Sequence, residues 1–327
     1  MSERAEPNER FECLVSLGSN LGQRQGLLTE AARRLAVHPL VREFRTSRLF
    51  TTPPIGGPGG QEPFLNAVAA FRTAAPAREI LLWLQAIEQQ LGRERKIRWD
   101  ARSIDLDVVL YGDLTGGGSD LIVPHPRYTA RLFVLLPACD IVPTWCDPRF
   151  GWTIQRLTDH LLAAPPSLAL VGGDADCRNR FCEQVARRLD IPWFAAPPLP
   201  AAPAVAANAP ADAASYGTNI SGQVQIEADP GQAWIAAAPP VLPTVAEEAT
   251  WSANHRLPRL LVRLQQTDAL HRWPAPHQIW PRGGRWPEYR LEIGDPQWAV
   301  EELVSAFDSL RCPVTAASDD GDWWKPS

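Results

Sequence analysis

Two spacings of apolar residues alternate along the first half of the chain. Runs in which every second residue is apolar predict strands, because successive side chains of a strand point to opposite faces. Runs with apolar residues three and four apart predict helices. The predicted strands are 11–19, 41–52, 64–74 and 105–113, and the predicted helices are 24–38, 76–92 and 153–163. This order predicts an α+β domain of ferredoxin-like type, an antiparallel sheet with helices on one face.

The pattern changes near residue 164, where a Pro-containing junction precedes a new strand. We place two domains at 1–163 and 164–327, the second being smaller and α/β. The stretch 167–194 has the outline of strand, loop and helix. Segments 233–239 and 257–265 predict buried strands, 289–293 an edge strand and 297–310 a terminal helix. An Ala/Pro-rich insertion, 195–214, is typical of an extended linker.

Composition narrows the classes of function. The 327 residues suffice for about two domains, and the formal net charge of −5 gives no overall attraction to nucleic acid. No signal peptide and no membrane-spanning run is predicted. The six scattered cysteines form no CxxC pair and predict reduced thiols in a cytoplasmic protein. A zinc site built on Cys177 and Cys182 is disfavoured, because no second ligand pair stands nearby.

Two carboxylates on one strand are the first candidate for chemistry. In "RSIDLDVVLYGD", Asp105, Asp107 and Val109 are expected on one face, with Leu106, Val108 and Leu110 on the other. Taken alone, the acids are consistent with the solvated face of an edge strand. Taken alone, the basic loop 93–102 is consistent with a surface ion-pair network. The two clusters together favour phosphoryl-type transfer, because carboxylates hold Mg²⁺ and arginines bind phosphate oxygens.

Four motifs in one order resemble a known family. They are "LVSLGSNLGQR", "TTPPIGGPGGQEPFLNAV", "LQAIEQQLGRERKIRWDARSIDLDVVLYGD" and "VPHPRYTARLFVLLP", within residues 11–163. They look like 6-hydroxymethyl-7,8-dihydropterin pyrophosphokinase, which moves pyrophosphate from ATP to a pterin in folate biosynthesis. The resemblance implies that the pterin hydroxyl attacks the β-phosphorus and AMP leaves.

The resemblance also implies the role of each site residue. Asp105 and Asp107 would bind two Mg²⁺ ions, and Arg93 and Arg102 would be catalytic. Contacts to ATP would come from Gln85, Glu88, Arg95, Trp99, His125 and Arg131. The pterin pocket would consist of Thr52, Pro53, Ile55, Phe64, Asn66 and Phe133.

Residue types agree with these roles, although each has an ordinary alternative. Phe64 and Phe133 can stack on a flat ring, yet alone they favour core packing. Asn66 can read an amide edge. His125 is equally consistent with loop packing, and Glu88 with a solvated helix position. The loop departs from the family at "WDAR", where a Gly-Pro is usual, and the missing proline predicts a looser turn and an altered rate of loop closure.

The second half weakly resembles a deoxynucleoside-kinase-like P-loop unit. Counted from Gly172, the pattern G-x-x-x-x-G-K-[ST] ends here in Cys177, Arg178 and Asn179. Phosphate binding would therefore be lost, although an active kinase or an ordinary α/β module stays open. Arginine and tryptophan alternate in 271–290, as in single-strand binding surfaces, but loop packing explains them better. A pseudoenzyme whose second half docks a partner is the rival to the enzyme.

Overall fold

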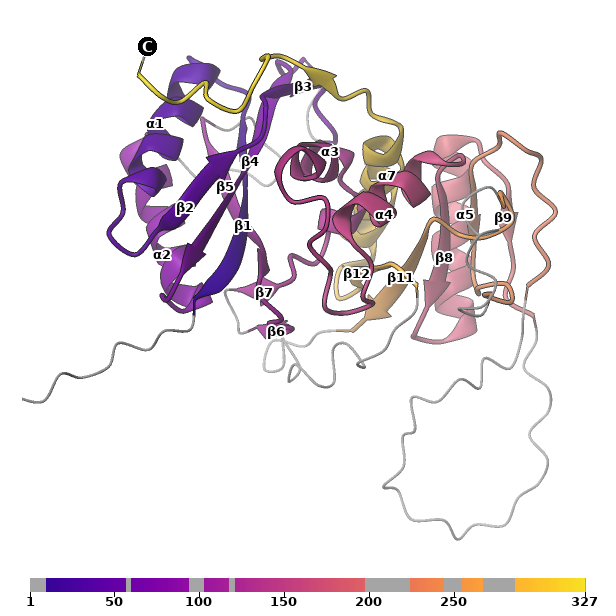
Figure 1. Cartoon of the computed structure of the whole chain (residues 1–327). Helices are drawn as coiled ribbons and strands as arrows, with labels where there is room; N and C mark the ends of the chain where they lie inside the picture. Colours follow the sequence, from indigo (N-terminus) through magenta and orange to yellow (C-terminus); the bar gives the residue numbers. More distant parts are fainter. Residues whose placement is uncertain are drawn as a thin grey trace, which may run out of the picture.

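The computed structural model describes residues 10–56, 60–93, 103–117, 121–197, 224–243, 254–266 and 286–326. Two sheets lie at opposite ends of an elongated molecule, with helices between and outside them (Figure 1). A further two-stranded ribbon joins β6 (Gly116–Gly117) and β7 (Ile122–Val123).

The first sheet is antiparallel, and its strands pair in the order β13-β3-β4-β1-β5, with β2 also on β4. Its bounds are β1 (Phe11–Ser19), β2 (Arg42–Thr46), β3 (Phe50–Thr52), β4 (Phe64–Thr73), β5 (Asp105–Tyr111) and β13 (Thr315–Ala316). The expected α+β sheet is therefore confirmed. The strand predicted at 41–52 is divided into β2 and β3, and both halves pair with β4.

Helices α1 (Arg24–Ala36) and α2 (Ala77–Gln90) cover one face of this sheet. Leu28, Leu35, Ile80 and Leu84 are fully or almost fully buried against it, as the helical spacing predicts. Pro76 stands at the start of α2, and Gly92 follows the end of the helix with φ of 80°, a conformation that glycine adopts without strain.

A second helical layer covers the opposite face. It consists of the 3₁₀ turn η1 (Tyr128–Ala130), α3 (Leu132–Ile141) and α4 (Ile154–Leu162). The prediction of helices on a single face is thus incomplete. The sequence of α3, "LFVLLPACDI", is apolar all round and contains Pro137, so it has no 3.6-residue period to detect.

The second sheet is parallel, with the order β12-β11-β8-β10-β9. Its strands are β8 (Ser167–Val171), β9 (Trp193–Phe194), β10 (Trp234–Ala236), β11 (Leu260–Gln265) and β12 (Glu288–Glu292). Helices α5 (Ala175–Leu189) and α7 (Pro296–Arg311) pack against this sheet. The α/β character is confirmed, and β12 stands at the edge, as predicted for 289–293.

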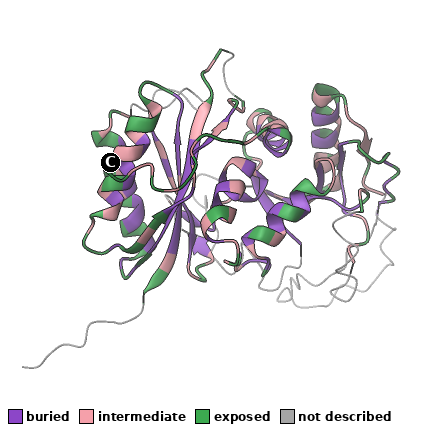
Figure 2. Ribbon diagram, turned by 45° about the horizontal axis from the view of Figure 1, so that its top comes forward, coloured by how far each residue is buried: buried purple, intermediate pink, exposed green. Residues whose placement is uncertain are grey.

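One apolar core joins the two halves. It runs from Leu14 and Val68 of the first sheet, through α3 and α4, to Leu170 and Phe307 beyond them. Figure 2 shows buried residues along the strands and on the inward sides of the helices. After α7 the chain returns to the first sheet, where Thr315 of β13 pairs with Thr51 of β3. No described helix has the length and apolar character needed to cross a bilayer.

Candidate active site

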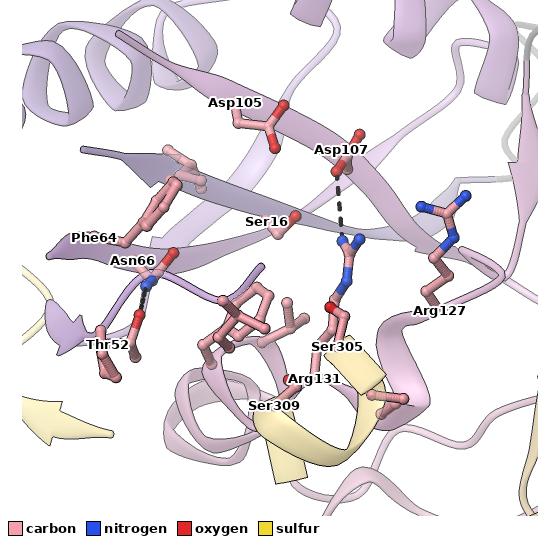
Figure 3. Close-up of a pocket in the computed structure, with 18 of the residues that line it drawn as sticks. Ser16, Thr52, Phe64, Asn66, Asp105, Asp107, Arg127, Arg131, Ser305 and Ser309 are labelled. Atoms are coloured by element: carbon pink, nitrogen blue, oxygen red, sulfur yellow. Dashed lines mark hydrogen bonds and ion pairs between the residues drawn. The ribbon is translucent and has the colours of Figure 1, made fainter. Parts of the chain in front are cut away.

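A cavity of about 250 Å³ lies between the first sheet and helices α3 and α7. Figure 3 shows side chains from β1, β4 and β5 on one side of it and α7 on the other. Its lining includes polar side chains from both halves of the chain: Ser16, Thr52, Gln61, Asn66, Asp105, Asp107, Arg127, Arg131, Tyr289, Glu302, Ser305 and Ser309.

All the residues predicted to hold the pterin border this cavity: Thr52, Pro53, Ile55, Phe64, Asn66 and Phe133. Asn66 is 5% exposed, and its Nδ2 donates to Oγ1 of Thr52 at 2.8 Å (Figure 3). This bond sets the orientation of the Asn66 amide, with its NH₂ group toward Thr52. Phe64 and Phe133 are half-buried, so each ring keeps a surface on the cavity.

Asp105 and Asp107 also border the cavity, from β5. The pleat places them on the face opposite Leu106 and Val108, which pack under α1 and α2. This part of the predicted alternation is confirmed. Leu110 departs from it and joins the core on the cavity side, because the register between β1 and β5 shifts at this point by a bulge.

Behind Asp105 stands a buried charge cluster. The carboxylate of Glu88, 3% exposed, accepts from the backbone N–H of Leu106 at 2.8 Å and pairs with Arg93. Nη1 of Arg93 is also 2.8 Å from Oδ1 of Asp105. Burial raises the pKa of Glu88 to about 7, and the Arg93 charge opposes that rise. Arg93 is thereby held beside the first of the two acids.

His125 and Arg131 approach Asp107. Nδ1 of His125 accepts from the backbone N–H of Arg127 at 3.2 Å, which leaves the ring proton on Nε2, 4.0 Å from Oδ2 of Asp107. Burial, with Arg131 and Arg127 nearby, lowers the pKa of His125 well below its usual range, so the ring is neutral at pH 7. Nη1 of Arg131 is also 4.0 Å from Asp107 (Figure 3).

The remaining predicted site residues fall in two groups. Gln85 and Glu88 belong to α2, on the other side of the sheet, and neither borders the cavity. Arg95, Trp99 and Arg102 lie outside the described residues. Their predicted roles stay predictions.

Sequence reasoning missed part of the lining. Gly18 of β1 faces the cavity, and a Cβ there would lie 3.1 Å from Oδ1 of Asn66, so glycine keeps room for the amide. The larger omission is α7, which contributes Glu302, Ser305, Ala306 and Ser309. Their i, i+3, i+4, i+7 spacing, with small or polar side chains inside an apolar helix, was the available signal.

Comparison with known proteins places the cavity in a family context. The protein-family model for 7,8-dihydro-6-hydroxymethylpterin-pyrophosphokinase (HPPK) matches residues 14–143. A Pseudomonas aeruginosa 2-amino-4-hydroxy-6-hydroxymethyldihydropteridine pyrophosphokinase is 39% identical over 152 residues, covering 46% of this chain and 90% of that protein. The chain belongs to the HPPK family. A Bacillus subtilis HPPK of the same name is 39% identical over 127 residues, covering 39% of this chain and 75% of the relative.

A longer relative also matches. The bifunctional protein FolKE of Lactococcus lactis is 33% identical over 171 residues, which cover 52% of this chain. The match spans about half of FolKE, 48% of its length. The HPPK family match ends at residue 143, before α4, the parallel sheet and α7.

Proposed function

We propose that the protein transfers pyrophosphate from ATP to 6-hydroxymethyl-7,8-dihydropterin, forming the pterin diphosphate and AMP in folate biosynthesis. The observation that carries this proposal is a single cavity. It brings two aromatic rings and the Asn66–Thr52 pair together with Asp105 and Asp107. Membership of the HPPK family supports the same reaction.

Recognition of the pterin follows from the residue types at one end of the cavity. A pterin is flat and aromatic with an amide and amino edge, so Phe64 and Phe133 can stack on its ring. Asn66 can both donate to and accept from that edge, and its bond to Thr52 fixes its orientation before the substrate arrives. We assign Pro53 and Ile55 to the apolar rim of the same pocket.

Asp105 and Asp107 fit two magnesium ions. Both carboxylates border the cavity on one strand face. The described residues contain no cluster of three His, Cys, Asp or Glu side chains that could hold a metal. The two carboxylates of Asp105 and Asp107 suit Mg²⁺, which takes few protein carboxylates and fills its shell with water and phosphate oxygens. When bound, the ions would neutralise the charge of the phosphates and help to align them.

The cationic and neutral groups near the acids suit a polyphosphate. Arg131 can bind phosphate oxygens through its guanidinium, and neutral His125 can donate from Nε2. Glu88 pairs with Arg93 and holds it beside Asp105. The guanidinium would therefore stay in place when Asp105 binds a magnesium ion instead of Arg93. In the proposed step, the pterin hydroxyl oxygen bonds to the β-phosphorus and its proton passes to solvent. The bond from that phosphorus to the α,β-bridging oxygen breaks.

A turnover assay on the full chain tests this function. The protein is incubated with ATP, Mg²⁺ and 6-hydroxymethyl-7,8-dihydropterin, and AMP is quantified. We expect pterin-dependent AMP from the wild-type chain, loss of nearly all of it in Asp107→Ala, and retention in Asp113→Ala, an exposed acid just beyond β5. No AMP from the wild-type chain would refute the proposal. Calorimetric binding without turnover would instead support the pseudoenzyme.

For the C-terminal unit, we propose a P-loop-like α/β unit that has lost phosphate binding. Support comes from the central parallel strand β8, which leads through Gly172 and Gly173 into α5. Nη1 of Arg178 donates to the carbonyls of both glycines, at 2.9 and 2.7 Å, so the protein's own cation occupies the turn. Asp174 caps α5 by accepting from the N–H of Cys177.

This assignment predicts no kinase activity from the second unit. Phosphorylation of any deoxynucleoside by the full chain would refute it. We also propose the first boundary near residue 163 and a cytoplasmic location. The latter is supported by the six cysteines, all within the described ranges and all free thiols.

A further inference from the structure

Helix α7 forms one wall of the cavity, although it lies far outside the span that matches the HPPK family. Glu302, Ser305, Ala306 and Ser309 share one face of the helix, at i, i+3, i+4 and i+7. This face extends roughly 10 Å along the helix axis. Figure 3 shows α7 below the cavity, with Ser305 and Ser309 on the same side as Arg131.

Helix α7 is attached to the first half of the chain near its middle and beyond its C-terminus. Near its middle, Oε1 of Glu302 is 2.9 Å from Nη1 of Arg127, and Oε2 accepts from the hydroxyl of Tyr289 at 2.8 Å. Beyond its C-terminus, Thr315 pairs with Thr51 of β3, next to the predicted pterin residue Thr52. The helix therefore runs from the arginines of the phosphate end toward the Thr52 and Asn66 end.

Ser309 stands on the turn of α7 closest in sequence to that pairing with β3. The residue is 3% exposed and borders the cavity. Its Oγ has no hydrogen-bond partner among the residues that the structure describes. Buried hydroxyls without a partner are rare in proteins, and burying one without a hydrogen bond is unfavourable. A ligand in the cavity would supply the missing partner.

We propose that Ser309 is a substrate-binding residue supplied by the C-terminal half, and that its hydroxyl hydrogen-bonds the polar edge of the pterin held by Asn66. This inference rests on the proposed function, because it takes the pterin as occupant. A hydroxyl both donates and accepts, so it can meet either an amino group or a ring nitrogen. The C-terminal half then takes part in substrate specificity.

The test compares two buried serines in the full-length protein. Ser309→Ala removes a hydroxyl that has no hydrogen-bond partner in the described part of the chain. Ser167→Ala removes one that accepts from the N–H of Arg259 at 3.1 Å and donates to the carbonyl of Leu257. Calorimetry measures the Kd of 6-hydroxymethylpterin in the presence of Mg²⁺ and a non-hydrolysable ATP analogue. Thermal unfolding measures the Tm of each variant.

We expect Ser309→Ala to raise the pterin Kd about three- to tenfold, the effect of one lost neutral hydrogen bond, with Tm unchanged or higher. Ser167→Ala should show the reverse, a lower Tm with an unchanged Kd. The Kd of the ATP analogue should not change in Ser309→Ala. An unchanged pterin Kd in Ser309→Ala would overturn the inference. A higher Kd accompanied by a lower Tm would overturn it as well.

The proposed function and this inference fail in different ways. Wild-type protein that binds the pterin without releasing AMP would refute the function, and the Kd comparison would still decide the role of Ser309. Normal turnover with equal pterin Kd values in wild type and Ser309→Ala would refute only the inference. Wild-type protein that binds no pterin would refute both.

Discussion

Glu88 should make the stability of this protein depend on pH in an unusual direction. Its carboxylate is buried behind Asp105, bonded to the N–H of Leu106 and to Arg93. Burial, the largest effect, and the charges of Asp105 and Asp107 raise its pKa from the ordinary value of 4.5 to about 7, despite Arg93. The folded protein thus retains a proton on Glu88 at pH values where the unfolded chain has lost it.

The direction and size follow from that difference. Between pH 4.5 and about 7 the folded state binds more protons than the unfolded state, so rising pH lowers the free energy of unfolding. At about 1.4 kcal/mol per pKa unit, the full effect is on the order of 3 kcal/mol and is complete above pH 7. Below pH 4.5 both states are protonated and the penalty vanishes.

Glu88→Gln isolates this effect, because the amide oxygen can still accept from Leu106 and Arg93 but does not titrate. Urea unfolding of wild type and variant from pH 4 to 8 should show the variant gaining about 3 kcal/mol on the wild type across that range. The variant must be compared with the wild type at each pH, because buried His160 adds its own pH dependence to both proteins. The pKa of His160 is lowered to about 3, so this residue lowers stability as pH falls below 6.5.

Glu30→Gln is the matched control, since Glu30 pairs with Arg34 on the exposed side of α1. The same pH series on Glu30→Gln shows what the loss of an exposed carboxylate contributes. A constant difference for Glu88→Gln between pH 4.5 and 7.5 would refute the reasoning about Glu88.

Three further substitutions test the packing. Gly321→Ala should lower stability by about 1–3 kcal/mol, because its Cβ would overlap the carbonyl oxygen of Thr46; an unchanged Tm would contradict this. Gly26→Ala, inside α1 with ordinary contacts, should stabilise by about 0.5–1 kcal/mol in urea unfolding. Tyr128→Phe should cost about 1.5–3 kcal/mol, measured the same way, because the buried hydroxyl donates at 2.6 Å to Asp147, which is paired with Arg149.

Most of the first sheet could be predicted from periodicity alone. In β1 and β4 successive side chains enter different cores: Val15 and Leu17 lie under α1 and α2, whereas Leu14 and Val68 lie on the opposite face. That contrast also placed Asp105 and Asp107 on the cavity face. The bulge that moves Leu110 was not predictable, since nothing in "DVVLY" favours an extra residue at that point.

Within the second helical layer, α4 was predicted as the helix 153–163, but α3 could not be predicted for a physical reason. α3 is buried between the first sheet and the C-terminal half, so apolar residues occur on all its sides and the helical period disappears. The contribution of α7 was hidden differently. Its helix was predicted, but a contact between residues 175 positions apart, Arg127 with Glu302, depends on tertiary packing that no local pattern reports.

The composition of α7 explains how one helix can both dock and leave a cavity. Leu303, Phe307 and Leu310 are buried in the shared core and hold the helix in place. On the cavity face the side chains are small at Ser305, Ala306 and Ser309. Because interiors otherwise fill to close packing, larger apolar residues on that face would extend the core into this space. Small side chains on one face and large ones beside it therefore maintain an open pocket against a well-packed helix.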